Sequence, residues 1–195
     1  MVQISCPLIL ASRSPRRSHL LKQIGFEFSV EESGVEEVLD NSLSPSENVC
    51  RLSLEKAKVV ARRYLRGIVI GSDTVVSIDE TILGKPSSPD EARGMLRMLS
   101  GKTHTVFTGF ALVDAETQKS YIDFEKTEVT FRVLDDEEIR KYVDSGSPMD
   151  KAGAYGIQDD FGAVFVQRIN GCFYTVVGFP LPKFYTAFKK FVRDY

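Results

Sequence analysis

The sequence contains no tryptophan, only two histidines and only three cysteines in 195 residues. Two histidines cannot build a histidine-rich transition-metal site, so any metal must be held by carboxylates, which favours Mg²⁺ or Mn²⁺. Cys6, Cys50 and Cys172 are odd in number and form no C-x-x-C pair, which argues against a disulfide framework or a zinc site. A reducing cytoplasm is therefore the expected location.

Long apolar runs and a strong net charge are also missing. No run approaches the roughly 18–20 apolar residues that span a bilayer, and Arg13 ends the first apolar stretch too early for a signal peptide. The formal net charge of -2 is unlike the basic face of a general nucleic-acid binder. We therefore expect neither a membrane nor a nucleic acid as partner. The length suits one large domain or two small lobes.

Hydrophobic periodicity and helix-capping motifs predict a mixed α/β protein. Ser44 and Ser88 are each followed by proline and, three residues on, by glutamate, which marks two helix starts. Helices are expected over 15–24, from 45 to about 66, from 89 to about 99, over 136–143 and from 182 onward. Strands are expected over 7–11, 26–30, 68–78, 104–114 and 120–133. The Asn170-Gly171 dipeptide predicts a hairpin that joins strands 163–169 and 173–177.

An apolar run near the N-terminus ends in a serine-rich turn and a helix start. Ser14 is predicted as the N-cap and Pro15 as the first helical residue, because proline is tolerated where the backbone N–H is unbonded. The first turn then carries Arg16 and Arg17, although cations are unfavourable at this end of a helix. With Ser12 just upstream, hydroxyls, N–H groups and guanidinium groups would form an anion pocket suited to phosphate. The alternative is an exposed arginine pair on an ordinary helix.

Asp73 is a carboxylate within a strand whose two faces should both be buried. Such a group is costly unless it meets a metal or a positive partner. Gly71, two residues upstream, allows another group to approach the backbone closely. The alternative is a buried aspartate that caps a helix or accepts backbone N–H groups.

Further polar residues stand at positions suited to a ligand. Lys56 shares an i, i+4 stripe with apolar residues of its helix, although lysine side chains often extend to the surface from such places. Lys85 lies in a tight turn, Glu36 lies in an acidic turn, and Lys151 and Gln158 flank a segment with two glycines. Each has a structural alternative. Together they supply metal ligands, phosphate-directed cations and an amide able to read a base edge.

With these motifs in this order, the chain resembles the Maf family of nucleoside triphosphate pyrophosphatases nearly from end to end. The resemblance rests on His104 and on segments 10–17, 35–37, 56–58, 70–76, 83–86, 95–101, 150–158 and 176–180. It implies an α/β fold with a mixed, twisted central sheet, flanking helices and a deep cleft between two lobes, similar to the inosine-triphosphate pyrophosphatases. It also implies a single Maf-like domain over residues 1–195.

The resemblance implies hydrolysis of a nucleoside triphosphate between the α and β phosphates, which yields a monophosphate and pyrophosphate. Mg²⁺ is the implied cofactor, with Mn²⁺ or another divalent cation as a substitute. Glu36 and Asp73 would hold the metal, and Asp73 would also orient or deprotonate the attacking water. The residues carried over to the triphosphate are Ser12, Arg16, Arg17, Lys56, Lys85 and Lys151.

Within the family, one branch prefers dTTP and UTP, with some modified pyrimidines, and another prefers 7-methyl-GTP. The Ser-Pro-Arg-Arg sequence that ends at Arg17, together with Thr74 and Gln158, resembles the pyrimidine branch, and a glutamine amide matches the O4 and N3–H edge of uracil and thymine. The chain departs from the family pattern at 159–162, beside the expected base pocket. A 7-methyl-GTP or other noncanonical purine pyrophosphatase is one alternative. A nucleotide-binding regulator of septum formation and cell division is another. The resemblance also implies a homodimer.

Overall fold

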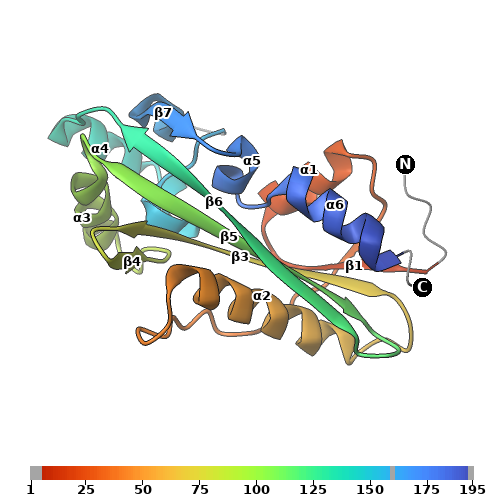
Figure 1. Ribbon diagram of the computed structural model, residues 1–195. Helices are drawn as coiled ribbons and strands as arrows, with labels where there is room; N and C mark the ends of the chain where they lie inside the picture. Colours follow the sequence, from red (N-terminus) through yellow and green to blue (C-terminus); the bar gives the residue numbers. More distant parts are fainter. Residues whose placement is uncertain (1–5, 159–160, 193–195) are drawn as a thin grey trace. The chain divides into compact units, whose positions relative to one another are not determined.

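The computed structural model describes residues 6–158 and 161–192, and seven strands of this part form one mixed sheet (Figure 1). The order is β2-β1-β3-β5-β6-β7, with β4 paired to β3. β1 runs parallel to β2 and β3, whereas β4 is antiparallel to β3, and β7 is antiparallel to β6. The predicted mixed α/β class is confirmed. The strands are β1 (Leu8–Ala11), β2 (Ser29–Val30), β3 (Ile68–Ile78), β4 (Thr81–Leu83), β5 (Thr103–Asp114), β6 (Ser120–Phe131) and β7 (Val166–Asn170).

Helices flank this sheet, and the capping motifs account for where two of them begin. The α-helices are α1 (Pro15–Gln23), α2 (Pro45–Ala61), α3 (Pro89–Leu99), α4 (Asp136–Asp144), α5 (Phe173–Val177) and α6 (Leu181–Phe191). Short 3-10 helices span Ser147–Asp150, Ala152–Ala154 and Phe161–Phe165. The hydroxyls of Ser44 and Ser88 accept the backbone N–H three residues ahead, as predicted. Within the described part of the chain, no helix combines the length and hydropathy that a membrane span requires.

The described residues pack into two compact units, and β3, β5 and β6 run through both. Unit 1 takes its residues from 1–73, 108–125 and 178–195. Unit 2 takes its residues from 74–107 and 126–177. The single domain over residues 1–195 stays a prediction.

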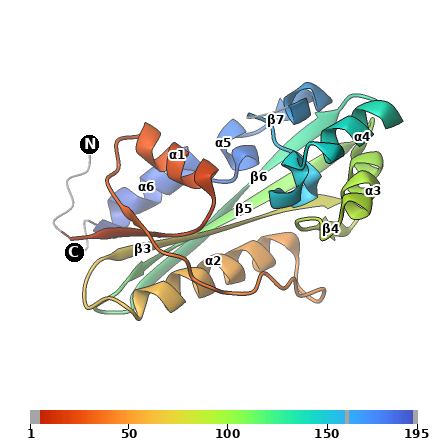
Figure 2. The same ribbon diagram turned by 180° about the vertical axis from the view of Figure 1, so that it is seen from behind.

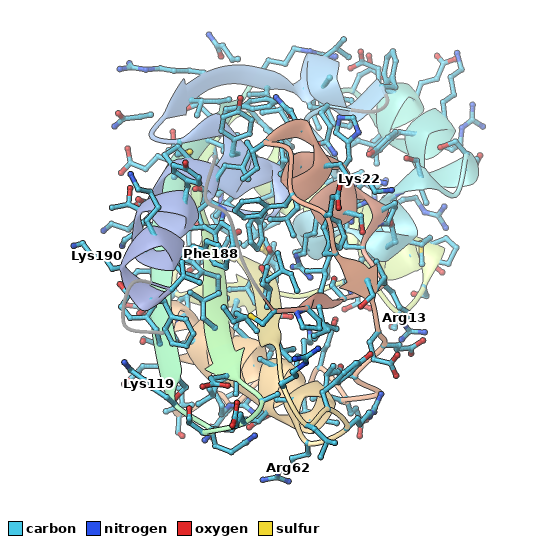
Figure 3. All side chains as sticks on the ribbon, turned by 90° about the vertical axis from the view of Figure 1, so that its right-hand side faces the viewer. Arg13, Lys22, Arg62, Lys119, Phe188 and Lys190 are labelled. Atoms are coloured by element: carbon cyan, nitrogen blue, oxygen red, sulfur yellow. The ribbon has the colours of Figure 1, made fainter. Side chains whose placement is uncertain are left out.

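Unit 1 covers its strands on both faces. α2 packs on one face through small and branched side chains, whereas α1 and α6 lie on the opposite face (Figures 1 and 2). Phe188 of α6 turns toward the strands and Lys190 turns away from them (Figure 3). Phe188 contacts Phe26 with ring centroids 5.0 Å apart, and Phe184 is likewise buried. The aromatic stripe of the terminal helix therefore closes the core of its own unit.

Unit 2 has a separate core beneath α3 and α4. The rings of Phe131 and Tyr142 pack on Phe165 with centroids 6.0 and 5.1 Å away. Leu96 from α3 and Ile139 from α4 are fully or almost fully buried in the same cluster.

The predicted hairpin at Asn170-Gly171 is wrong, because residues 173–177 form helix α5 and β7 pairs with β6 instead. The hydroxyl of Thr127 on β6 accepts the backbone N–H of Cys172 and donates to its carbonyl oxygen, each at 3.0 Å. This contact takes the chain away from the sheet directly after Gly171.

Smaller differences concern element ends. α2 stops at Ala61 rather than near residue 66, and the strand expected over 26–30 is confined to Ser29–Val30. β4 was not predicted. Residues 159 and 160 of the departure from the family pattern lie outside the described residues.

Candidate active site

The turn after β1 is organised around the hydroxyl of Ser12. Ser14 is the N-cap of α1 and Pro15 its first residue, as the sequence predicts. Oγ of Ser12 accepts hydrogen bonds from the backbone N–H of Ser14 and from Nη1 of Arg17, both at 3.2 Å. Ser12 is buried. Ser12 therefore fixes Arg17 in place. The alternative interpretation of the sequence, an exposed arginine pair on an ordinary helix, does not predict this contact.

Arg17 is held at two of its nitrogens. Besides the bond to Ser12, Nε donates to the carbonyl oxygen of Gly178 at 2.9 Å. Burial lowers the pKa of Arg17, while the nearby carboxylates of Asp73 and Glu37 oppose that shift. An arginine nevertheless stays charged at neutral pH. Arg17 is thus a fixed cation near two carboxylates, with the half-buried Arg16 beside it in the helix.

Helix α2 lies so close to the strands of unit 1 that two strand positions admit only glycine. A Cβ at Gly71 of β3 would overlap the backbone oxygen of Ser53, and a Cβ at Gly109 of β5 would lie 2.6 Å from the corresponding oxygen of Val49. Alternate residues of a strand share a face, so Asp73 lies on the same face as Gly71. The close approach therefore brings Asp73 to the helix.

Lys56 of α2 lies between two carboxylates. Its Nζ is 2.5 Å from Oδ1 of Asp73 and 2.6 Å from Oε1 of Glu37. Lys56 and Asp73 are each 4% exposed, whereas Glu37 reaches the group from a surface loop. A buried carboxylate is costly without a cationic partner. Lys56 supplies the partner that the position of Asp73 demands, and the group keeps one formal negative charge in excess.

Glu37 is the member of this group that our sequence analysis missed. The Glu36-Glu37 pair was visible in the sequence, but neighbouring residues of a loop give no sign of which one turns inward. Glu36 has an exposed side chain, and its assignment as a metal ligand stays a prediction.

The carboxylates of Asp73 and Glu37 fit the chemistry of a hard divalent cation. Oδ1 of Asp73 and Oε1 of Glu37 both bind Nζ of Lys56, so a cation would bind the two carboxylates beside that ammonium group rather than in its place. Mg²⁺ typically binds through one or two carboxylates together with substrate phosphates. Among the described residues, no group of three or more Asp, Glu, His or Cys side chains could hold a metal.

Comparison with known proteins places the chain in a family. The family model described as "Maf-like protein" matches residues 7–191. The chain belongs to the Maf family. It is 46% identical over 191 residues to a "dTTP/UTP pyrophosphatase" of Caldicellulosiruptor saccharolyticus, with 96% of each chain covered. A protein of the same name from Bacillus mycoides is 48% identical over 187 residues, again with 96% of each chain covered. One from Desulforamulus reducens is 45% identical over 185 residues, covering 95% of this chain and 96% of its own.

Unit 2 of this Maf chain holds the remaining predicted residues. Lys85 is exposed in the loop after β4, and Thr74 follows Asp73 on β3. Lys151 is 9% exposed, and its Nζ donates to Oδ1 of Asp150 at 2.8 Å. Gln158 is half-buried.

Two loops of unit 2 are joined through their backbones. The N–H of Gly153 donates to the carbonyl oxygen of Gly84 at 3.0 Å. This bond links the loop of Lys85 to the segment that carries Lys151 and Gln158. The structure thus brings Ser12, Arg17, Lys56 and Asp73 together in unit 1, and it connects the chain around Lys85 with that around Lys151 in unit 2.

Proposed function

We propose that this chain hydrolyses dTTP and UTP to the monophosphate and pyrophosphate. The observation that carries the proposal is the buried contact of Lys56 with Asp73, next to the fixed cation of Arg17. It combines a carboxylate able to act on water with cations able to bind phosphate. The relatives named dTTP/UTP pyrophosphatase support the choice of substrate.

In the proposed reaction, the oxygen of a water molecule attacks the α phosphorus. The bond from that phosphorus to the oxygen bridging to the β phosphate breaks, and pyrophosphate leaves. Asp73 orients the water and accepts its proton, while Lys56 holds the carboxylate in place. Phosphoryl transfer depends mainly on positioning and neutralisation of charge, so no histidine or cysteine nucleophile is required.

The cationic residues and the hydroxyl of Ser12 are assigned to the phosphates. Ser12, Arg16 and Arg17 contribute from unit 1, where the hydrogen bonds of Arg17 pre-organise its guanidinium group. On the strength of the family resemblance we also assign Lys85 to the phosphates. Lys151 is assigned there as well, although its ammonium group also binds Asp150.

A divalent cation, Mg²⁺ or in its place Mn²⁺, would be held by Asp73 together with Glu37. When bound, it would neutralise charge on the triphosphate and on the departing pyrophosphate. The family resemblance assigns the second carboxylate to Glu36, which is the alternative ligand.

We assign base selection to unit 2. The amide of Gln158 offers a donor and an acceptor to the O4 and N3–H edge of uracil or thymine, and Thr74 is a further substrate contact. Modified pyrimidine nucleotides share this edge and are included among the proposed substrates.

We place the protein in the cytoplasm, where its three free cysteines would remain reduced. A homodimer and a contribution to septum formation are further proposals, suggested by the family resemblance. Light scattering after size exclusion tests the first. Complementation of a division phenotype by an inactive variant tests the second.

The deciding experiment is product analysis with Mg²⁺ and dTTP, UTP, CTP, GTP, 7-methyl-GTP and ITP, resolving monophosphate from diphosphate. Monophosphate and pyrophosphate from dTTP and UTP, lost in Asp73→Asn, are the expected result. Turnover of purine nucleotides alone would keep the reaction and refute the pyrimidine preference. Tight nucleotide binding without turnover would favour a regulatory role.

A further inference from the structure

Segment 151–158 of unit 2 is tied to three other parts of that unit. Besides the bond from Gly153 to Gly84, the N–H of Gly156 donates to the hydroxyl of Tyr142 at 3.2 Å. The hydroxyl of Tyr155 is hydrogen-bonded to Nε2 of His104, with 2.8 Å between the two atoms. These bonds come from the loop after β4, from α4 and from β5.

The backbone of the segment adopts a conformation that requires such support. Gly153 and Ala154 both have left-handed backbones, with φ of 68° and 59°. A Cβ at Gly153 would lie 2.8 Å from Cγ2 of Val76, so a side chain is excluded there. Left-handed alanine is uncommon, and such residues persist where their surroundings over-determine them. The segment is therefore built to hold one shape.

His104 is the least expected of the supporting residues. It is 2% exposed, and its ring meets the rings of Phe131 and Tyr155 edge to face at 4.9 and 5.4 Å. Nδ1 of His104 is buried and has no hydrogen-bond partner among the described residues. Burial lowers the pKa of His104 to about 4, so the ring is neutral at pH 7.

Packing alone does not explain a histidine at this place. A buried nitrogen without a partner is destabilising, and an apolar side chain would fill the same space without it. What the imidazole adds is the bond to Tyr155, whose own hydroxyl would otherwise be buried without that partner. The pair thus orients a tyrosine that stands three residues before Gln158, with the buried Ile157 between them.

We propose that His104 is a positioning residue for base selection, which acts through Tyr155 to hold segment 151–158 so that Gln158 presents its amide to a pyrimidine with O4 and N3–H. This inference rests on the proposed function and deepens it. His104 itself contacts no substrate.

The test compares UTP with CTP, which differ only at the base edge that Gln158 is assigned to read. His104→Leu and Tyr155→Phe each remove the bond, whereas His104→Gln keeps a polar atom near the position of Nε2. Ser100→Ala is the matched control, because Oγ of Ser100 accepts the N–H of Leu134 at 2.8 Å elsewhere in unit 2. The readouts are kcat/KM for both nucleotides and calorimetric binding of UMP and CMP.

His104→Leu and Tyr155→Phe should each lower the preference for UTP over CTP by about threefold to tenfold, the scale of one hydrogen bond. The loss should appear mainly in KM for UTP. The two effects should be less than additive in the double variant, and His104→Gln should restore most of the preference. Ser100→Ala should lower the Tm and leave the preference unchanged.

An unchanged preference in Tyr155→Phe and His104→Leu would overturn the proposal, as would an equal loss in Ser100→Ala. Monophosphate binding separates this result from failure of the proposed function. If the wild-type protein hydrolyses neither dTTP nor UTP, the proposed function fails, yet its preference for UMP over CMP still reports on segment 151–158. A wild-type protein that binds UMP and CMP equally would refute the inference itself.

Discussion

Nζ of Lys56 lies 2.5 Å from Oδ1 of Asp73, and both residues are almost fully buried. The contact joins α2 to β3, so it belongs to the framework of unit 1 as well as to the proposed chemistry. Removing two charges from water is expensive, and the pair is favourable only while both partners remain. Stability and activity should therefore respond together when either residue is changed.

Lys56→Met should destabilise the protein by about 3–5 kcal/mol, because it leaves the carboxylate of Asp73 buried beside Glu37 without its cation. The double variant Lys56→Met/Asp73→Asn should recover part of that loss. Urea unfolding of the three proteins at pH 7 measures both effects. A loss below about 1 kcal/mol in Lys56→Met would show that the pair behaves like an exposed ion pair.

Glu37→Gln should lower kcat/KM by about 10–100-fold and raise the Mg²⁺ concentration needed for half-maximal rate. The substitution removes a carboxylate that binds the metal directly or orients one of its ligands. Glu36→Gln is the matched control, with the same substitution one residue away on an exposed side chain. A larger effect in Glu36→Gln would support the assignment made from the sequence and would refute the assignment of Glu37.

Gly71→Ala should destabilise the protein by about 1–3 kcal/mol or more, because the new methyl group overlaps the backbone of α2 at Ser53. It should also reduce activity, since β3 carries Asp73. Gly94→Ala in α3 makes the same chemical change where nothing lies within 4 Å, and it should stabilise by about 0.4–1 kcal/mol. Equal thermal unfolding temperatures for the two variants would contradict the close packing of α2.

Stability should fall as the pH drops below about 6.5. The pKa of His104 is about 4 in the folded protein, against an ordinary value of 6.5. Between these two pH values the unfolded chain therefore binds more protons than the folded protein. The contribution of the neutral His104 ring to the free energy of unfolding is fully present above pH 6.5 and is lost toward pH 4. The loss should reach about 3 kcal/mol. Urea unfolding from pH 7 to pH 4.5 should show a steeper decline for the wild type than for His104→Gln, and parallel declines would contradict the burial of a neutral imidazole.

Local sequence was sufficient for most of the secondary structure of this protein. The starts of α2 and α3 follow from Ser44 and Ser88. Each capping hydroxyl contacts the glutamate three residues later, so the whole capping interaction lies within one helical turn. The apolar helical stripe of Lys56 left open whether its side chain is buried or extends to the surface, whereas the apolar strand of Asp73 already indicated that this carboxylate needs a metal or a positive partner. The order of motifs along the chain was enough to indicate the family.

Only the tertiary structure decided which neighbours those residues meet. The turn signal of Asn170-Gly171 was overridden because Thr127, more than forty residues away, binds Cys172. Glu37 rather than Glu36 reaches Lys56, because the path of a loop depends on the surface over which it passes. The hydrogen bond between His104 and Tyr155 is visible only in the folded chain. In each case the deciding contact joins residues far apart in sequence, and its energy depends on packing that no local pattern records.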